Sequence, residues 1–203
     1  RQKMTTNNES AVLRTIGYVR NNCRERKAMT ALGVPSAVEV LPEFAPGLLH
    51  FEKHSHVWVM AWLDGVDREV LQVVPRGLKP APGQEPDPRD LHGVFAVRSP
   101  ARPNPIGLTV AKVIDRDGTR IELDRLDFID GTPVLDLKPY FTSRDCIFSA
   151  RNRQVGRNAN VDAVREAVTM QALAFCGEES DDLLLAVEIL THFRSEVLEF
   201  RDP

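Results

Sequence analysis

The strongest constraint on the fold of this chain is a series of short apolar runs of strand length, separated by turn signals. Eight such runs follow one another: Val12–Val19, Ala37–Leu41, His56–Leu63, Glu69–Val74, Gly93–Val97, Leu108–Ile114, Arg120–Leu126 and Val134–Leu137. The DRDG turn at Asp115–Gly118 is a strong hairpin signal, and a second DG pair follows at Asp130. This spacing predicts an all-β core, a sandwich or a barrel, with the proline-rich stretch Pro75–Asp90 as a long surface loop.

The pattern changes after about Arg144. Residues 151–160 form a basic polar connector, and from Val161 apolar residues recur at helical spacing. The first stripe is Val161, Val164, Val168 and Leu173; the second, after Ser180 as a predicted N-cap, is Leu183, Val187, Leu190, Phe193 and Val197. We therefore expect a mainly β domain over residues 1–145 and, over residues 146–203, a connector with two C-terminal α-helices that pack on the β domain or on another subunit.

Composition narrows the class of protein. The chain of 203 residues is 42% apolar and 27% charged, as in an ordinary globular protein. It has neither the roughly 18 consecutive apolar residues of a membrane span nor an N-terminal signal sequence, so we expect a cytoplasmic protein with no membrane contact. Three cysteines without a CxxC pair favour reduced thiols. His50, His54 and His56 lie beside an apolar run, and we expect no metal site.

Charge is unevenly distributed along the chain. From Val161 to the end, ten acidic residues and three arginines give a net charge of −7, so the total of −3 leaves +4 for residues 1–160. We therefore expect any polyanion to contact the first part of the chain.

The stretch RSPARPNPIG, Arg98–Gly107, is stiff and polar. Its three prolines restrict their own φ and the residues before them, which predicts a preordered loop. Asn104 lies between two prolines, and Arg98 and Arg102 suit a carboxylate or phosphate. The residues alone leave two interpretations open: a ligand-binding loop, or a rigid corner whose arginines pair with nearby acids.

RSPARPNPIGL, followed by DGTPVLDLKPY at Asp130–Tyr140, resembles the signature pair of the TrmO family, also called TsaA-like or YaeB-like proteins. The resemblance runs from about Ile16 through GLLHFEKHSHVWV, Gly47–Val59, to Tyr140, and it does not cover the helical tail. It implies a small β-barrel, usually a homodimer, that binds S-adenosylmethionine without a Rossmann domain. No G-x-G-x-x-G follows any predicted strand, which agrees with donor binding without a Rossmann domain.

The resemblance also implies an activity: methylation of N6 of threonylcarbamoyl-adenosine, next to the anticodon of tRNA. It assigns donor contacts to Met29, Thr30, Ala31, Leu63, Asp64, Arg98, Leu108, Asp124, Arg125, Leu126 and Asp127. Leu63 and Leu108 would sandwich the adenine, the acids would contact ribose hydroxyls or the amino group, and Arg98 would hold the carboxylate. One departure stands out: Met29–Ala31 replaces the Pro-Arg-Gln or Pro-Trp-Gln type tripeptide of the family, so contacts there would come from the backbone.

Methyl transfer needs alignment of the acceptor nitrogen with the donor, and a carbamoylated N6 must also lose its proton to a base. The candidate catalytic residues are Asp136 and Tyr140, with Lys138 lowering the pKa of the phenol or contacting phosphate. As structural alternatives, Asp136 holds the RPNP loop, Arg102–Pro105, in place, and Tyr140 closes the barrel. The predicted substrate-binding residues are Arg102, Asn104, Lys138 and Arg153, and further basic candidates for RNA contact are Arg20, Arg24, Arg26, Lys27, Arg144, Arg151 and Arg157.

Three functional hypotheses follow. The first is a tRNA N6-methyltransferase. The second is a methyltransferase of the same fold that acts on a small molecule or another acceptor, favoured by the acidic tail, because fold does not fix substrate. The third is a catalytically silent binding module whose altered Met29–Ala31 loop has lost affinity for the donor.

Overall fold

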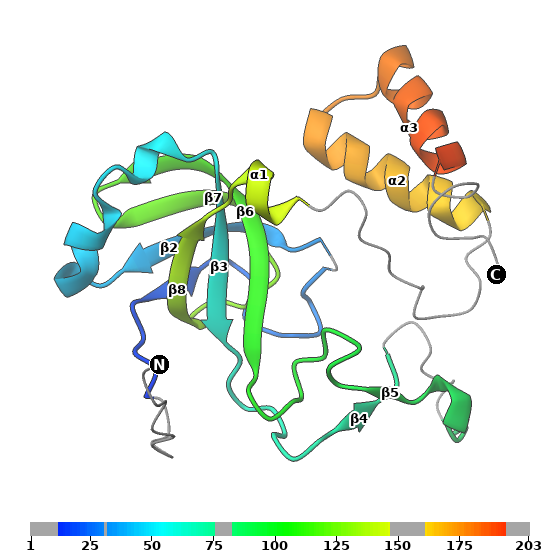
Figure 1. Ribbon diagram of the computed structural model, residues 1–203, viewed down its shortest axis with the longest axis horizontal. Coiled ribbons are helices and arrows are strands. Elements are labelled where there is room, and N and C mark those ends of the chain that lie inside the picture. The colour runs from blue at the N-terminus through cyan, green and yellow to red at the C-terminus, as the bar shows by residue number, and fades with distance from the viewer. Residues whose placement is uncertain (1–11, 31, 76–82, 147–160, 194–203) are drawn as a thin grey trace, which may run out of the picture. The chain divides into compact units, whose positions relative to one another are not determined.

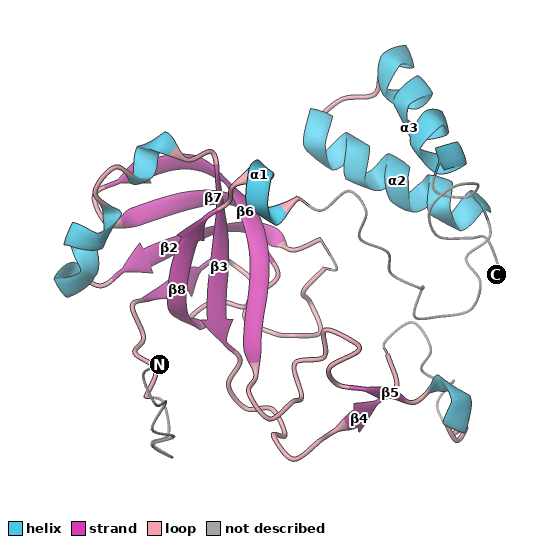
Figure 2. Ribbon diagram, in the orientation of Figure 1, coloured by secondary structure: helices cyan, strands magenta, loops and turns pink. Residues whose placement is uncertain are grey.

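Six antiparallel strands close into a barrel (Figures 1 and 2). The computed structural model describes residues 12–30, 32–75, 83–146 and 161–193. The barrel strands are β1 (Gly17–Arg20), β2 (Val34–Val40), β3 (His56–Trp62), β6 (Ile106–Asp117), β7 (Arg120–Leu126) and β8 (Pro133–Pro139), in the spatial order β1-β2-β7-β6-β3-β8. The prediction of a small β-barrel is confirmed.

Strand alternation fills the barrel. In β3, Val57, Val59 and Ala61 are buried, whereas the residues between them are only partly buried and face outward. The inward residues of β3 join a core that includes Val19, Val38, Val40, Ile121, Leu123, Leu126 and Val134. Burial of this apolar surface is the main favourable contribution to folding of the barrel.

The β6–β7 connection follows the predicted hairpin. Asp117 pairs with Arg120, and Gly118 between them has a φ of 57°, a backbone conformation that glycine adopts without steric cost. The DRDG signal therefore marks a real turn. A short helix, α1 (Thr142–Asp145), follows β8, and two 3-10 helices, η1 (Pro42–Leu48) and η2 (Phe51–Lys53), lie between β2 and β3.

Two of the predicted strands are mostly wrong. Only β4 (Gln72–Val73) and β5 (His92–Gly93) form in the regions expected to hold strands at Glu69–Val74 and Gly93–Val97, and they pair with each other rather than with the barrel. Residues 94–97 turn instead, because the amide of Ala96 donates to the carbonyl of Gly93 at 2.9 Å. Phe95 is 79% exposed, whereas Val94 before it is buried. Likewise, β1 begins only at Gly17, so the expected strand start at Val12 is wrong.

The chain divides into two compact units. The first, residues 1–69 with 100–146, holds the barrel. The second, residues 70–99 with 147–203, holds the β4–β5 ribbon, the 3-10 helix η4 (Pro88–Asp90) and the helices α2 (Val161–Cys176) and α3 (Asp181–Phe193). The residues 70–99, which we expected to belong with the β domain, are thus grouped with the C-terminal helices.

The two predicted C-terminal helices form and pack on each other. Their shared core is Val168, Leu183 and Val187, and the hydroxyl of Ser180 accepts a hydrogen bond from the amide of Leu183 at 3.2 Å, as the predicted N-cap requires. The predicted second stripe is partly wrong, since Leu190 and Phe193 are exposed and Thr191 is buried. The side chains of Val164 and Val197 lie outside those described.

None of the helices in the described ranges is long and apolar enough to cross a membrane.

Candidate functional site

Most of the predicted donor residues gather at one end of the barrel. There β3 ends, β6 begins with Ile106 opposite Trp62, and β7 ends with Leu126 opposite Val34. We call this the loop end; it carries residues 21–30, 63–65, 104–109 and 124–132. The opposite end carries residues 41–55 and 140–146. The loop end brings together the donor residues predicted in four separate segments: Met29 and Thr30; Leu63 and Asp64; Leu108; and Asp124–Asp127. Ala31 lies outside the described residues.

The strands β6 and β7 are joined by side chains near the loop end. Their ladder runs from Asp117 and Arg120 to Val113 and Leu123. Beyond it, the carboxylate of Asp124 accepts the amide of Lys112 at 2.7 Å, and the hydroxyl of Thr109 donates to the carboxylate of Asp127. Asp124 also pairs with Arg125 at 3.2 Å. These bonds fix the directions of both carboxylates, whose remaining lone pairs are able to accept further hydrogen bonds.

Tight packing at the start of β6 orders the neighbouring segments. The amide of Leu63 donates to the carbonyl of Pro105 at 2.8 Å. A Cβ atom on Gly107 would lie 2.5 Å from Cε1 of Phe128 and 3.2 Å from Cδ2 of Leu63, so only glycine fits there. Leu63 therefore lies on the inward face of β6 beside Gly107, and Leu108 faces outward. The structure does not place these two leucines face to face.

Leu126 differs from the other predicted donor residues in its burial. Its side chain is fully buried in the barrel core, so only its backbone can contact a ligand. Gly33, with a φ of +84°, approaches it so closely that a Cβ atom would lie 2.6 Å from the Leu126 carbonyl. The hydroxyl of Thr30 donates to the Gly33 carbonyl at 2.6 Å, which closes this turn beside the end of β7.

Asn21 connects the β1–β2 loop to the segment after β7. Its side-chain amide donates to the hydroxyl of Ser36 at 3.0 Å and to the carbonyl of Phe128 at 2.9 Å. Its side-chain oxygen accepts the amide of Cys23 at 2.9 Å, and its own amide donates to the carboxylate of Asp130 at 3.2 Å. Sequence reasoning missed this residue, because three of its four partners are far away in the chain and two of the four are backbone atoms.

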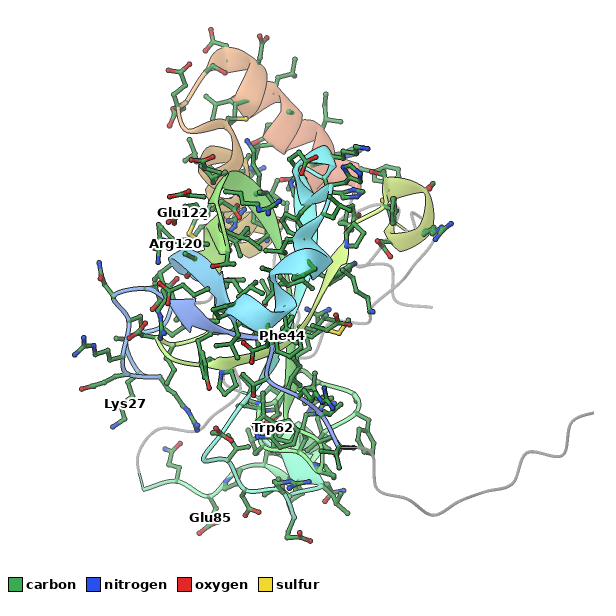
Figure 3. The ribbon with its side chains drawn as sticks, turned by 90° about the vertical axis from the view of Figure 1, so that its left-hand side faces the viewer. Lys27, Phe44, Trp62, Glu85, Arg120 and Glu122 are labelled. Carbon is green, nitrogen blue, oxygen red and sulfur yellow. The ribbon has the colours of Figure 1, made fainter. Side chains whose placement is uncertain are left out.

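The RPNP stretch is held by a residue that the sequence did not indicate. Nε of Arg68 donates to the carbonyl of Pro103 at 2.9 Å, and the guanidinium lies 5.5 Å from the centre of the Trp62 ring. Trp62 is labelled in Figure 3. Asn104 is exposed, and Arg102 is half-buried and engaged with other groups of the protein.

Arg98 is exposed and belongs to the second unit. Its contact with the donor carboxylate stays a prediction. Arg153 lies outside the described residues, as do Arg151 and Arg157.

Asp136 and Lys138 lie on the outer face of β8, and Tyr140 directly follows the end of this strand. Asp136 lies opposite Met60, accepts the amide of Leu137 at 2.9 Å and pairs with Lys138 at 2.7 Å. It does not pin the RPNP loop through any contact among the described residues; Arg68 does so.

Tyr140 lies at the opposite end of the barrel. Its amide donates to the carbonyl of His56, and the seven residues of β3 that separate His56 from the loop end span about 20 Å. Burial, followed by the nearby Cys146 and Asp145, raises the pKa of the Tyr140 phenol. The expectation that Lys138 lowers this pKa is wrong, since Lys138 pairs with Asp136 instead.

Two of the basic residues considered for RNA contact, Arg20 and Lys138, are engaged in ion pairs, and so is Arg120, which was not among the candidates. Arg20 pairs with Glu39 at 2.6 Å, and Arg120 bridges Glu39 at 3.0 Å and Glu122 at 2.6 Å (Figure 3). Lys27 is exposed on the β1–β2 loop, with its side chain directed away from the barrel in Figure 3. These ion pairs reduce the positive charge that the described strands offer to a phosphate backbone.

The histidines of the HFEKHSH stretch pack against aromatic rings. His54 contacts Phe141 edge-on at 5.5 Å between ring centres, and His56 lies 6.3 Å from Tyr140. Within the described ranges, no group of three or more His, Cys, Asp or Glu side chains could hold a metal ion.

Comparisons with known proteins agree with this architecture. Residues 18–146 match the family model of the tRNA-methyltransferase O N-terminal domain. A solved structure, TrmO from Pseudomonas aeruginosa, matches with a TM-score of 0.55 and 31% identity, over 71% of this chain and 62% of that one.

Three sequence relatives differ in how much of their length is matched. A probable S-adenosyl-L-methionine-binding protein of Archaeoglobus fulgidus is 38% identical over 154 residues, which are 75% of this chain and 38% of the relative. An S-adenosyl-L-methionine-binding protein of the same organism is 33% identical over 70% of this chain and 99% of its own length. The mouse tRNA (adenine(37)-N6)-methyltransferase is 41% identical over 100 residues, which are 48% of this chain and 21% of the mouse protein.

Proposed function

The chain belongs to the TrmO family, and from this premise we propose that it is an S-adenosylmethionine-dependent methyltransferase that modifies N6 of threonylcarbamoyl-adenosine beside the anticodon of tRNA. The observation that carries the proposal is the overlap between the family match and the barrel. The family match covers residues 18–146, a range that includes nearly all of the six barrel strands and the predicted donor segments at the loop end. The mouse relative, named as a tRNA adenine-N6-methyltransferase, supports tRNA as the acceptor.

The loop end fits the polar groups of the donor. Asp64 is exposed, and Asp124 and Asp127 are oriented by the Lys112 amide and the Thr109 hydroxyl. Carboxylates held in this way accept hydrogen bonds from ribose hydroxyls and from an amino group without further ordering. A relative matched along 99% of its length is named an S-adenosyl-L-methionine-binding protein, which supports binding by a barrel of this size. When bound, the donor supplies an electrophilic methyl group.

Asp136 is the residue that we propose accepts the N6 proton. Its carboxylate faces outward from β8 beside Met60, nearer the loop end than Tyr140, and the Lys138 ammonium and the Leu137 amide fix its direction. Tyr140 is a weaker candidate for a base, because its raised pKa keeps the phenol protonated at neutral pH. We propose that Tyr140 contributes as a hydrogen-bond donor.

We assign contacts with the RNA to Arg102, Asn104, Lys138 and Arg153. We assign the contact with the carboxylate of the donor to Arg98. A homodimer in the cytoplasm, as the family resemblance implies, completes the proposal; light scattering of the purified chain tests the dimer.

A second candidate function is methyl transfer to an acceptor other than tRNA. It is favoured by the engagement of Arg20 and Arg120 with Glu39 and Glu122, which leaves the described barrel strands with little free positive charge. The helices α2 and α3 together carry five acidic residues and one arginine. Both features weaken attraction to a polyanion.

Mass spectrometry of tRNA nucleosides distinguishes the two. A strain that lacks the gene should lose the doubly modified adenosine, and the wild-type gene, but not a D136N variant, should restore it. Unchanged nucleosides in the deletion strain, together with donor binding by the purified protein, would favour the second function.

A further inference from the structure

Arg26 joins two loops that are remote in sequence. Its guanidinium donates from Nη2 to the carbonyl of Asp64 and from Nη1 to the carbonyl of Gly65 at 3.4 Å. Both acceptors are main-chain atoms just after the end of β3, and Gly65 has a left-handed φ of 66°. A planar guanidinium with several N–H groups can hold two successive carbonyls at once, which an ammonium cannot do with the same geometry.

The connection is made farther along the β1–β2 loop than the hydrogen bonds of Asn21. Asn21 holds the root of the β1–β2 loop against the Phe128 carbonyl and the Asp130 carboxylate. Arg26 lies near the tip of the same loop, and Asp64 lies beyond the last residue of β3. The two Arg26 bonds therefore fix the main chain that carries the Asp64 carboxylate.

We propose that Arg26 is a positioning residue for the methyl donor: it fastens the β1–β2 loop to the Asp64–Gly65 segment and so preorders the side of the site to which Asp64 belongs. The inference rests on the proposed function, because it assigns Arg26 to the donor site. A segment that is ordered before binding loses less conformational entropy when the ligand arrives, and affinity rises accordingly.

The sign of the expected effect separates positioning from simple electrostatics. S-adenosylmethionine carries a sulfonium and an ammonium against one carboxylate, so it is a net cation at neutral pH. Removal of a nearby positive charge would strengthen its binding if charge alone mattered. Loss of a positioning contact weakens its binding instead.

Lys27 is the matched control. It is the next residue in the same loop, carries the same charge, is exposed and points away from the barrel (Figure 3). A K27A variant removes one positive charge from the loop and leaves the Arg26 bonds in place. An R26K variant keeps the charge at position 26 but not the fork of donors.

Isothermal titration calorimetry of the full chain with S-adenosylmethionine tests the inference. We expect R26A to raise Kd about fivefold, at the lower end of the range for coupling between two elements. R26K should recover part of the loss, and K27A should bind like the wild type. The melting temperature without donor should be the same for R26A and K27A, because both side chains are exposed and a surface substitution changes stability little.

The outcomes separate the inference from the proposed function. If the wild type binds the donor and R26A binds equally well or more tightly, Arg26 has no positioning role and the inference is overturned, while the proposed function stands. If R26A and R26K both lose affinity only in proportion to a lower melting temperature, the role is structural and the inference is again overturned. If the wild type does not bind the donor, the proposed function itself fails.

Discussion

Replacement of Gly107 by alanine tests the packing that orders the loop end. The new Cβ atom would lie 2.5 Å from Cε1 and 3.0 Å from Cζ of Phe128, and 3.2 Å from Cδ2 of Leu63. Carbon atoms in contact are normally about 3.5–4.0 Å apart, so the Phe128 ring must move by about 1 Å. That ring is 4% exposed and packed in the barrel core, which leaves it little space to do so.

The cost of this overlap sets the size of the effect. An extra methyl group in a well-packed core costs about 1–3 kcal/mol of the free energy of unfolding. Taking about 2 kcal/mol, and a shift of about 2–4 °C per kcal/mol for a chain of this length, we expect the melting temperature of G107A to fall by about 4–8 °C. Because Leu63 precedes Asp64 directly, its displacement should also weaken binding of S-adenosylmethionine.

Thermal unfolding followed by circular dichroism measures the first effect, and calorimetry with the donor measures the second. Gly47 offers a matched control, since a Cβ atom there would have no neighbour within 4 Å. The G47A variant should melt and bind like the wild type. A G107A protein that melts within about 1 °C of G47A would refute the packing argument.

Three further predictions concern single side chains. N21A should lower the free energy of unfolding by about 2–3 kcal/mol, because it removes side-chain hydrogen bonds to three partners. N21Q should not restore the lost stability. Urea unfolding measures both variants, and an N21A protein as stable as the wild type would contradict the role of Asn21. The Arg20 guanidinium holds the pKa of the Glu39 carboxyl below its usual 4.5, so this ion pair stabilises the barrel above about pH 4.5 and the stabilisation is lost as the pH falls. E39Q should therefore melt slightly below the wild type at pH 7 and at the same temperature as the wild type near pH 3. An equal difference in melting temperature at both pH values would contradict the stabilising role of the Arg20–Glu39 pair. D136N should abolish methyl transfer while donor binding persists. Y140F should retain the pH dependence of methyl transfer that the wild type shows in single-turnover assays. A pH profile altered by Y140F would indicate that the Tyr140 phenol is the base.

The sequence predicted the barrel strands best where alternation and turn chemistry agreed. The run around β3 alternates inward and outward residues, and the DRDG signal between β6 and β7 fixes a hairpin. The strands β3, β6 and β7 therefore lie close to their predicted positions. At 93–97 the apolar residues lacked such support: Phe95 is exposed, and the backbone turns back on Gly93. Apolar composition alone did not distinguish a strand from a turn there.

The site was harder to predict because it depends on long-range main-chain contacts. The residues Asn21, Arg26 and Arg68 all bind carbonyls of segments far away in sequence, and no local pattern marks such partners. Motif resemblance predicted donor contacts for Asp64, Asp124 and Asp127, and the antiparallel order of β3, β6 and β7 brings these three residues to one end of the barrel. The same order places Tyr140 at the other end, a consequence of strand direction that spacing within LDLKPY does not reveal.

The most direct test of donor binding at the loop end is hydrogen–deuterium exchange with and without S-adenosylmethionine. Ordering by the donor should slow exchange of the amides in residues 63–65 and 124–128, and amides in residues 50–55 and 140–146 at the opposite end should exchange at unchanged rates. Protection confined to the opposite end, or no protection at saturating donor, would contradict the placement of the methyl donor proposed for this barrel.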